Sequence, residues 1–299
     1  MLLIRPVYKV DAYTTSPLQG NPAGVMPLAR GMDEEGMRAV AREVNASETA
    51  FVFPSRQADV KMRFFTPTQE VPFCGHALVA ALKVLEELGE IAVHGPFTRV
   101  QVETGVGVLA ADLVWDEKGL RVDTTQAPPV FRPYTEAADR LLDALGAQPE
   151  DLRTDLPLEL AYTGLWHLIV PLTSQEALDG LLPDFRGLAA LNRDVGVLTT
   201  HVFVEEEGFF CRDFSPAAGV DEDPVTGSAS GALGAYLLRH KAVQPSVPLQ
   251  MIQGEACGRP GEVRVVVEGR PGEPTRVVVG GHAVVSVRGN VFLGPRQAR

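Results

Sequence analysis

The sequence predicts an α+β protein made of two similar halves, each a mixed β-sheet rolled around a central α-helix. Three observations predict this fold class. A segment recurs after roughly 150 residues, short apolar strand patterns cover much of the chain, and amphipathic helix patterns are few. The chain has 299 residues, 45% of them hydrophobic, which is enough to bury two cores.

The recurring segment is a short strand, a loop with acidic residues, and a helix that begins with glycine. Arg63-Phe-Phe-Thr-Pro matches Arg212-Asp-Phe-Ser-Pro, and Cys74-Gly-His-Ala then matches Thr226-Gly-Ser-Ala. We interpret this recurrence as an internal repeat. The alternative is that two Ala/Gly-rich helices resemble each other by chance. Each copy would direct free backbone N–H groups and a positive dipole end at a ligand, so two such helix starts predict an anion site.

The remaining elements follow from periodicity and from start and stop signals. Asp33 and Thr135 are expected helix N-caps, and Gly89 and Gly146 are expected to end helices. Helix patterns occupy 32–45, 76–88 and 135–145. Strand patterns occupy 2–13, 49–54, 98–104, 107–115, 165–170, 197–205, 262–268, 275–279 and 282–288.

Composition excludes several classes of function. The net charge of -11, with no Lys/Arg cluster, argues against nucleic-acid binding. No apolar run reaches the roughly 20 residues of a membrane helix, and no signal peptide follows Met1, so we expect a cytoplasmic protein without membrane contact. Cys74, Cys211 and Cys257 are widely spaced, and no nucleotide-binding or metal-binding motif occurs. We therefore expect neither a metal nor another cofactor.

Glu48 is the first candidate for chemistry. It lies between a helix end and an apolar strand, where Phe51 and Phe53 could raise its pKa and suit it to proton transfer near neutral pH. A capping or surface glutamate is the alternative from position alone.

The two helix starts of the repeat supply further candidates. Asp223 could be a second acid/base group, and Gly227 and Ser228 could hold a carboxylate, although an ordinary N-terminal cap would give the same local pattern. His76 could accept or relay a proton as a neutral imidazole, since a helix N-terminus disfavours its charged form. A purely structural histidine is the alternative.

Cys74 and two loop residues complete the set. A helix start can activate the Cys74 thiol, but the equivalent position is Thr226, so a two-thiol racemase lacks its second thiol and a buried small residue is preferred. Asn21 could touch substrate, although turn chemistry alone explains it. Arg259 is a candidate carboxylate contact, but a structural role is preferred.

Together these pieces resemble the phenazine-biosynthesis-type isomerase family, which is related to diaminopimelate epimerase. The most specific matches are Asn45-Ala-Ser-Glu-Thr-Ala-Phe-Val and Glu222-Asp-Pro-Val-Thr-Gly-Ser-Ala. Three more segments match in order along nearly the whole chain: Val10-Asp-Ala-Tyr-Thr with Gly20-Asn-Pro-Ala-Gly-Val, Arg63-Phe-Phe-Thr-Pro through Cys74-Gly-His-Ala, and Gln253-Gly with Gly258-Arg-Pro.

The resemblance implies two pseudo-symmetric halves with a cleft between them, no cofactor and commonly a homodimer. It places the family's catalytic glutamate, histidine, aspartate and serine on Glu48, His76, Asp223 and Ser228. It also implies that the last strands return to the first half. With the prolines at 128, 129 and 133 as a linker, the expected halves are 1–127 with 281–299, and 128–280.

The resulting hypothesis is an isomerase that moves a proton on a small carboxylic acid through Glu48. The carboxylate would dock on Gly75, His76, Gly227 and Ser228, with Asn21 and Thr226 as further substrate contacts. Two alternatives stay open. One is a Cys74-dependent amino-acid racemase or epimerase, and the other is a non-catalytic protein that binds a small molecule.

Overall fold

The computed structural model describes residues 3–294. The chain divides into two compact units, Met1–Thr124 with Gly280–Arg299, and Thr125–Val279. Gln126 donates its N–H to Val277 O (2.9 Å) and Ala127 donates to Thr163 O (3.2 Å). These bonds hold 125–127 in the second unit, so its first residue lies three positions earlier than the sequence suggested.

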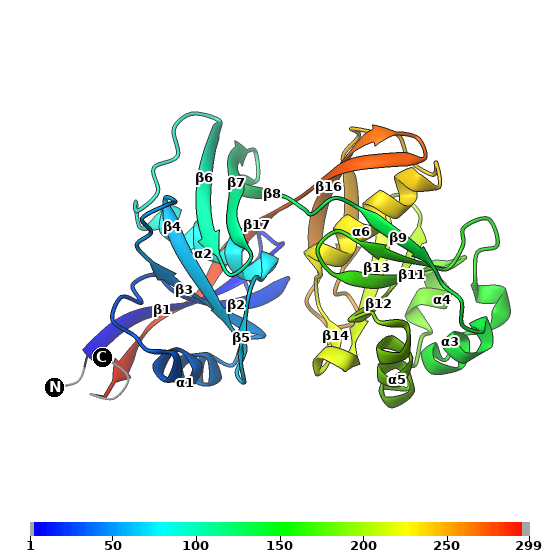
Figure 1. Ribbon diagram of the computed structural model, residues 1–299, viewed down its shortest axis with the longest axis horizontal. Coiled ribbons are helices and arrows are strands. Elements are labelled where there is room, and N and C mark those ends of the chain that lie inside the picture. The colour runs from blue at the N-terminus through cyan, green and yellow to red at the C-terminus, as the bar shows by residue number, and fades with distance from the viewer. Residues whose placement is uncertain (1–2, 295–299) are drawn as a thin grey trace. The chain divides into compact units, whose positions relative to one another are not determined.

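The first unit combines strands with two helices (Figure 1). Its helices are α1 (Glu34–Val44) and α2 (Gly75–Glu87). Its strands are β1 (Leu3–Ala12), β2 (Asn21–Met26), β3 (Glu48–Phe53), β4 (Val60–Phe65), β5 (Glu70–Val71), β6 (Phe97–Thr104), β7 (Gly107–Asp116), β8 (Gly119–Thr125) and the later part of β17 (Glu273–Leu293).

The strand pairings of the first unit form a closed ring. β17 pairs with β1 and β1 with β2 in antiparallel fashion, β2 with β3 in parallel, and β3 with β4 in antiparallel. β4 then pairs with β6 in parallel, β6 with β7 and β7 with β8 in antiparallel, and β8 pairs with β17. The mixed sheet is therefore a barrel.

The two helices of this unit occupy different environments. α2 packs against β1, β2 and β3 and is apolar and buried along nearly its whole length, as expected for a helix enclosed by a sheet. α1 is amphipathic and contacts β3 and β4 with one face, through Met37, Val40 and Ala41. Asp33 is its N-cap and accepts from the Gly36 N–H at 2.8 Å, which confirms the predicted cap.

The second unit has the same kind of mixed sheet, with more helices around it. Its helices are α3 (Ala138–Leu145), α4 (Gln175–Asp179), α5 (Phe185–Val195) and α6 (Gly227–Arg239), with 3-10 turns at Pro149–Asp151 and Pro216–Ala218. Its strands are β9 (Val130–Pro133), β10 (Glu159–Tyr162), β11 (Trp166–Pro171), β12 (Thr199–Glu205), β13 (Phe209–Ser215), β14 (Val220–Asp223), β15 (Leu249–Gln253), β16 (Gly261–Arg270) and the beginning of β17.

Close packing of α6 on the sheet depends on two glycines. A Cβ at Gly231 would lie 2.8 Å from Val279 Cγ2, and one at Gly234 would lie 2.6 Å from Val265 Cγ1.

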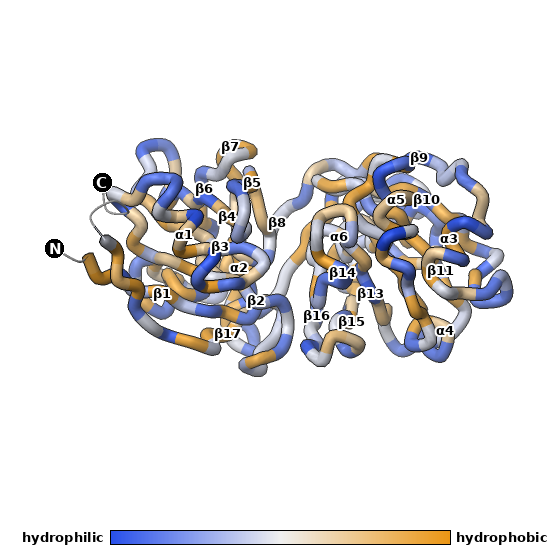
Figure 2. Tube along the Cα trace, turned by 90° about the horizontal axis from the view of Figure 1, so that it is seen from below, coloured by the Kyte–Doolittle hydropathy of each residue, from blue (hydrophilic) through white to orange (hydrophobic). Residues whose placement is uncertain are grey.

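The parallel pairs β11–β12 and β13–β15 alternate with antiparallel pairs, as β2–β3 and β4–β6 do in the first unit. Along the Cα trace, hydrophobic stretches alternate with hydrophilic turns in both units (Figure 2).

Each copy of the sequence repeat forms an antiparallel strand pair followed by a buried helix: β4–β5–α2 and β13–β14–α6. Both strand pairs carry a two-pronged Arg–Glu ion pair. Arg63 contacts Glu70 at 2.7 and 2.5 Å, and Arg212 contacts Glu222 at 2.9 and 2.8 Å. Each guanidinium also lies over the phenylalanine two residues later, 5.2 and 4.9 Å from the ring centroid.

Two predicted element boundaries were wrong. Helix α3 begins at Ala138 after an Ala137 N-cap without a side-chain bond, so Thr135 is not its cap. The patterns at 275–279 and 282–288 form one strand, β17, because Gly280 and Gly281 continue it in extended form. Among residues 3–294, no helix is long and apolar enough to span a bilayer.

Candidate active site

Glu48 is the first residue of β3, next to Ala23 of the parallel strand β2. The chain reaches this position by reversing at Asn45, which ends α1 in the left-handed conformation (φ 50°) that asparagine tolerates. Its carboxylate is mostly buried, with a side-chain exposure of 20%. The helix end and the strand start therefore hold Glu48 on backbone that is itself fixed by hydrogen bonds.

His76 lies directly against Glu48. It is the second residue of α2, and its Nε2 is 3.2 Å from Glu48 Oε2 and 3.1 Å from Ser47 Oγ. The Ser47 hydroxyl donates to Pro22 O at 3.4 Å, so its oxygen is free to accept the Nε2–H of His76. Ser47 was not predicted as a site residue. It belongs, however, to one of the two most specific segments of the family resemblance.

The protonation states differ from the sequence-based expectation. Burial acts to raise the pKa of Glu48, but His76, Ser47 and Cys74 together lower it below its usual value. Burial acts to lower the pKa of His76, but the hydrogen bond to Cys74 Sγ and the neighbouring Glu48 carboxylate raise it above its usual value. The expectations of a raised Glu48 pKa and a neutral His76 are therefore wrong, since the two opposite shifts favour a carboxylate–imidazolium pair.

Cys74 is the N-cap of α2, and its Sγ lies 3.4 Å from His76 Nδ1. Burial and the Glu48 charge raise the pKa of its thiol, so it stays neutral. Glu48, Cys74 and His76 could present three metal ligand atoms within 4.8 Å of one another. Metal binding would require the thiolate, which this environment disfavours. The arrangement fits an acid/base pair better than a metal centre.

One further buried residue borders the start of α2. A Cβ on Gly75 would lie 3.6 Å from Tyr13 Oη, which places this phenol beside the helix start. Tyr13 was not predicted as a site residue, although it belongs to a segment that carries the family resemblance. Asn21 is fully buried at the start of β2 and pairs with Ala12, so its contact with substrate stays a prediction.

In the second unit, Asp223, Thr226, Gly227 and Ser228 lie together at the start of α6. Asp223 ends β14, opposite Asp213 of β13. Thr226 is the N-cap position of α6, yet its side chain makes no cap bond. Its Oγ1 instead lies 2.5 Å from Asp223 Oδ2, so the ordinary capping alternative does not hold for Thr226.

Gln253 secures this helix start from β15. Its Oε1 accepts the Thr226 N–H at 3.1 Å, and its Nε2 donates to Asp223 O at 2.7 Å. Gln253 belongs to a segment that carries the family resemblance, but the sequence assigned it no role. The backbone N–H of Arg259 bonds to Gly254 O, and its predicted carboxylate contact stays a prediction.

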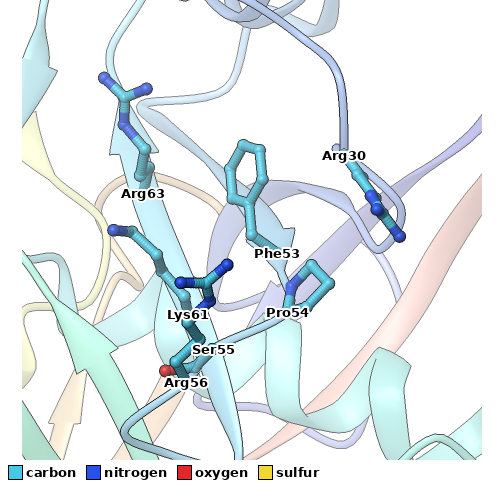
Figure 3. Close-up of a pocket in the computed structure, with 7 residues that line it drawn as sticks. All are labelled: Arg30, Phe53, Pro54, Ser55, Arg56, Lys61 and Arg63. Atoms are coloured by element: carbon cyan, nitrogen blue, oxygen red, sulfur yellow. The ribbon is translucent and has the colours of Figure 1, made fainter.

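A basic pocket lies elsewhere on the first unit (Figure 3). It is lined by Arg30, Phe53, Pro54, Ser55, Arg56, Lys61 and Arg63. Two of its cations are already neutralised, since Lys61 pairs with Glu103 at 2.8 Å and Arg63 pairs with Glu70. None of the predicted catalytic residues lines it, so it is not the candidate active site.

The ion pair predicts a specific dependence of stability on pH. The lowered Glu48 pKa stabilises the folded protein fully above pH 4.5, which is the pKa expected for Glu48 in the unfolded chain. This stabilisation is lost as the pH falls through the lower pKa of Glu48 in the folded protein. The raised His76 pKa stabilises the folded protein fully below pH 6.5, the pKa expected for His76 in the unfolded chain. This stabilisation is lost as the pH rises through the higher pKa of His76 in the folded protein. The loss of stability caused by His76→Asn should therefore be largest between pH 4.5 and 6.5.

Urea unfolding of the wild type and His76→Asn at a series of pH values would measure this difference. His94→Asn, a change of an exposed histidine, is the matched control. A difference that grew steadily toward alkaline pH would contradict the ion pair.

Comparisons with known proteins agree with this fold. A sequence profile described as "Phenazine biosynthesis-like protein" matches residues 10–289. The chain is 37% identical to an uncharacterised isomerase of Escherichia coli O157:H7, over 93% of this chain and 95% of that protein. It is 34% identical to a trans-2,3-dihydro-3-hydroxyanthranilate isomerase of Pseudomonas fluorescens, over 95% and 98%.

The fold has a solved counterpart. The crystal structure of a PhzF-family phenazine biosynthesis protein from Bacillus anthracis superposes with a TM-score of 0.90 at 30% identity, covering 97% of this chain and 100% of that one. Relatives named as isomerases favour an enzyme over the binding-protein alternative. Sequence profile, relatives and fold coincide over nearly the whole length, and the chain belongs to the phenazine biosynthesis-like family of isomerases.

Proposed function

We propose that this isomerase moves a proton within a small carboxylic acid, without a cofactor, and that Glu48 is its main acid/base group. The observation that carries the proposal is the state of Glu48 Oε2. This atom is buried and accepts no well-aligned hydrogen bond from the described residues, although His76 Nε2 lies 3.2 Å away. A buried carboxylate oxygen with a free lone pair is suited to remove a proton from carbon.

The proton-transfer step needs only groups of this chain. Glu48 takes a proton from one carbon of the substrate, becomes a neutral acid, and returns the proton to another carbon or to the opposite face. The His76 imidazolium stabilises the carboxylate before the transfer and supplies positive charge near the negative charge that develops on the substrate.

The substrate is proposed to be held through its carboxylate. The N–H groups of Gly75 and His76 at the start of α2 have no intrahelical acceptors, and the helix dipole favours an anion there. Gly227 and Ser228 open α6 in the same way. We propose Gly75 and His76 as carboxylate contacts, with Asn21 as a further substrate contact. The roles of Gly227, Ser228 and Thr226 as substrate contacts and of Asp223 as the second proton carrier stay predictions from the sequence.

Hydrogen exchange at carbon is the direct test. Purified protein would be incubated in D₂O with trans-2,3-dihydro-3-hydroxyanthranilate, the substrate in the name of a relative, and with a panel of cyclic and amino acids. Proton NMR should show deuterium at a carbon position of one compound, with no cofactor added. A parallel incubation with EDTA should give the same rate. A rate that depended on a metal would instead favour a metal site at Glu48, Cys74 and His76.

The Cys74-dependent racemase is the competing mechanism. Because its buried thiol stays neutral, Cys74→Ser should change the rate by less than about tenfold, whereas loss of a nucleophile or essential acid/base group costs far more. The exchange assay above would measure it, with Cys257→Ser as control for loss of a thiol elsewhere. A loss of about 10³-fold or more in Cys74→Ser alone would favour the thiol mechanism.

Several wider expectations accompany this function. We propose that the units are pseudo-symmetric copies, which the paired Arg63–Glu70 and Arg212–Glu222 contacts support. A cytoplasmic homodimer without nucleic-acid or membrane partners remains a prediction from the sequence and the family.

A further inference from the structure

A buried polar network lies beneath the start of α6, in a region that is otherwise apolar core. Its centre is Asp213, whose side chain is fully buried on β13. Asp213 Oδ1 accepts from Thr199 Oγ1 at 2.8 Å and from His201 Nδ1 at 3.0 Å. Asp213 Oδ2 accepts from Ser215 Oγ at 3.2 Å and lies 3.1 Å from Thr226 Oγ1.

The position of Asp213 in the repeat marks it as unusual. The register of the two copies places Phe64 at the equivalent position of β4, and Phe64 is a buried core residue. A buried carboxylate that replaces a core phenylalanine costs desolvation energy, which only well-formed hydrogen bonds can offset. Packing alone therefore gives no reason for an aspartate here.

Asp213 is held as a carboxylate. It has four neighbouring donors, and burial, which acts to raise the pKa of Asp213, is outweighed by His201, His167 and Thr199, which lower it. His167 Nδ1 lies 2.8 Å from Thr199 Oγ1, and burial lowers the pKa of His167 to about 4, so this imidazole is neutral. The Thr199 hydroxyl then accepts from His167 and donates to Asp213.

The Thr226 hydroxyl contacts two carboxyl groups but has one proton. Its Oγ1 lies 3.1 Å from Asp213 Oδ2 and 2.5 Å from Asp223 Oδ2, and it also accepts from Gln253 Nε2 at 3.2 Å. If both aspartates were ionised, one of these oxygen–oxygen contacts would have no hydrogen between its atoms and would be repulsive. If Asp223 is a neutral acid, every contact is satisfied. Asp223 and Gln253 then donate to Oγ1, and Oγ1 donates to Asp213.

We propose that Asp213, acting through the Thr226 hydroxyl, is a positioning residue that keeps a proton on Asp223. When Asp223 gives up this proton, the Thr226 O–H turns about its C–O bond and donates to the new Asp223 carboxylate. The Thr226 proton never leaves its oxygen, and the only bond broken is the O–H bond of Asp223. The use of this proton in turnover rests on the proposed function, in which Asp223 carries a proton. The presence of the proton on Asp223 in the resting protein is independent of that function.

Charged and titratable groups around Asp213 come from several elements. His201 of β12 contacts Asp213 directly, and His167 of β11 is linked to it through the Thr199 hydroxyl. Cys211 lies two residues before Asp213 on β13, and burial raises the pKa of its thiol. Asp223 of β14 is its carboxyl neighbour across Thr226. Because Asp213 and Asp223 share one hydroxyl, their titrations are coupled.

A titration without substrate tests the proposal. Protein labelled with ¹³C at the aspartate carboxyl carbons would be titrated by NMR, and the Asp223 signal assigned by its loss in Asp223→Asn. The Asp223 midpoint in the wild type should lie at least about one pH unit above the ordinary 3.9. Asp213→Asn should move it down by at least about one unit, because it removes the negative charge and frees the hydroxyl for Asp223.

A double-mutant cycle separates the hydroxyl from simple charge repulsion. In a Thr226→Val background, Asp213→Asn should move the Asp223 midpoint by less than half as much, while a Thr226→Ser background should keep the full effect. Equal shifts in the valine and threonine backgrounds would overturn the proposal. If Asp213→Asn failed to fold, the wild-type titration would still decide, since an ordinary or lowered Asp223 midpoint would refute the stored proton.

The same variants separate this proposal from the proposed function. If Asp223 titrates as predicted but no compound exchanges hydrogen at carbon, the stored proton is supported and the isomerase mechanism is refuted. If Glu48-dependent exchange occurs but the Asp223 midpoint is ordinary, the isomerase mechanism is supported and the stored proton on Asp223 is refuted.

Discussion

Glu48→Gln should lower kcat by about 10²–10⁴-fold, the usual contribution of a positioned acid/base group. Glutamine has nearly the same shape as glutamate, so Ser47 and His76 can keep their places beside it. It cannot accept a proton from carbon. The interaction lost exists only while the proton moves, so kcat should fall and KM should change little.

Turnover of the compound identified by deuterium exchange would give kcat and KM for this variant. Glu90→Gln is the matched control, since Glu90 is exposed in the turn after α2. The control should keep wild-type kinetics and stability, and Glu48→Gln should remain folded at the temperature of the assay. Wild-type turnover by a folded Glu48→Gln protein would refute Glu48 as the acid/base group.

Phe51→Ala should have the largest effect on stability, lowering the free energy of unfolding by about 3–5 kcal/mol. Phe51 is fully buried on β3 and packs edge-to-face on Phe65, with ring centroids 5.5 Å apart. Its ring joins β3 to the apolar face of α1 through the cluster that contains Met37 and Val40. Truncation leaves a cavity between helix and sheet that rigid strand pairing cannot close.

Calorimetry or urea unfolding would measure the loss, with Phe97→Ala as control because half of the Phe97 side chain is exposed. The control should cost less than about 1.5 kcal/mol. Because β3 also carries Glu48, the folded fraction of Phe51→Ala should show reduced activity as well as reduced stability. Equal losses in the two variants would show that the α1–β3 core is not a main source of stability.

Local sequence signals located the candidate site but not its charges. The turn after α1 and the glycine at the start of α2 were visible in the sequence, and the structure brings Glu48 and His76 to 3.2 Å. Phe51 and Phe53 suggested a raised Glu48 pKa, because apolar neighbours in sequence were read as its surroundings. In a strand, successive side chains face opposite sides, and residues brought in from α2 set the pKa instead.

Partners from distant strands were beyond sequence reasoning. Gln253 and Asp213 reach Thr226 from β15 and β13, and only the strand pairing makes them neighbours. Thr135 was assigned as a cap by residue type, but the helix begins three residues later. Helix α5 was not predicted, although its start and stop signals are present in the sequence, since Asp184 caps it and Gly196 ends it.

The long strand β17 also constrains the order in which the protein can fold during synthesis. Its later part pairs with β1, and β17 also pairs with β8, so the barrel that encloses α2 has an open edge until those residues leave the ribosome. The second unit, Thr125–Val279, is continuous in sequence and complete earlier. Domains usually fold in the order of synthesis, but here the unit that begins first is completed only after the whole second unit has been made. Glu48 and His76 therefore acquire their final surroundings only after β17 has been made.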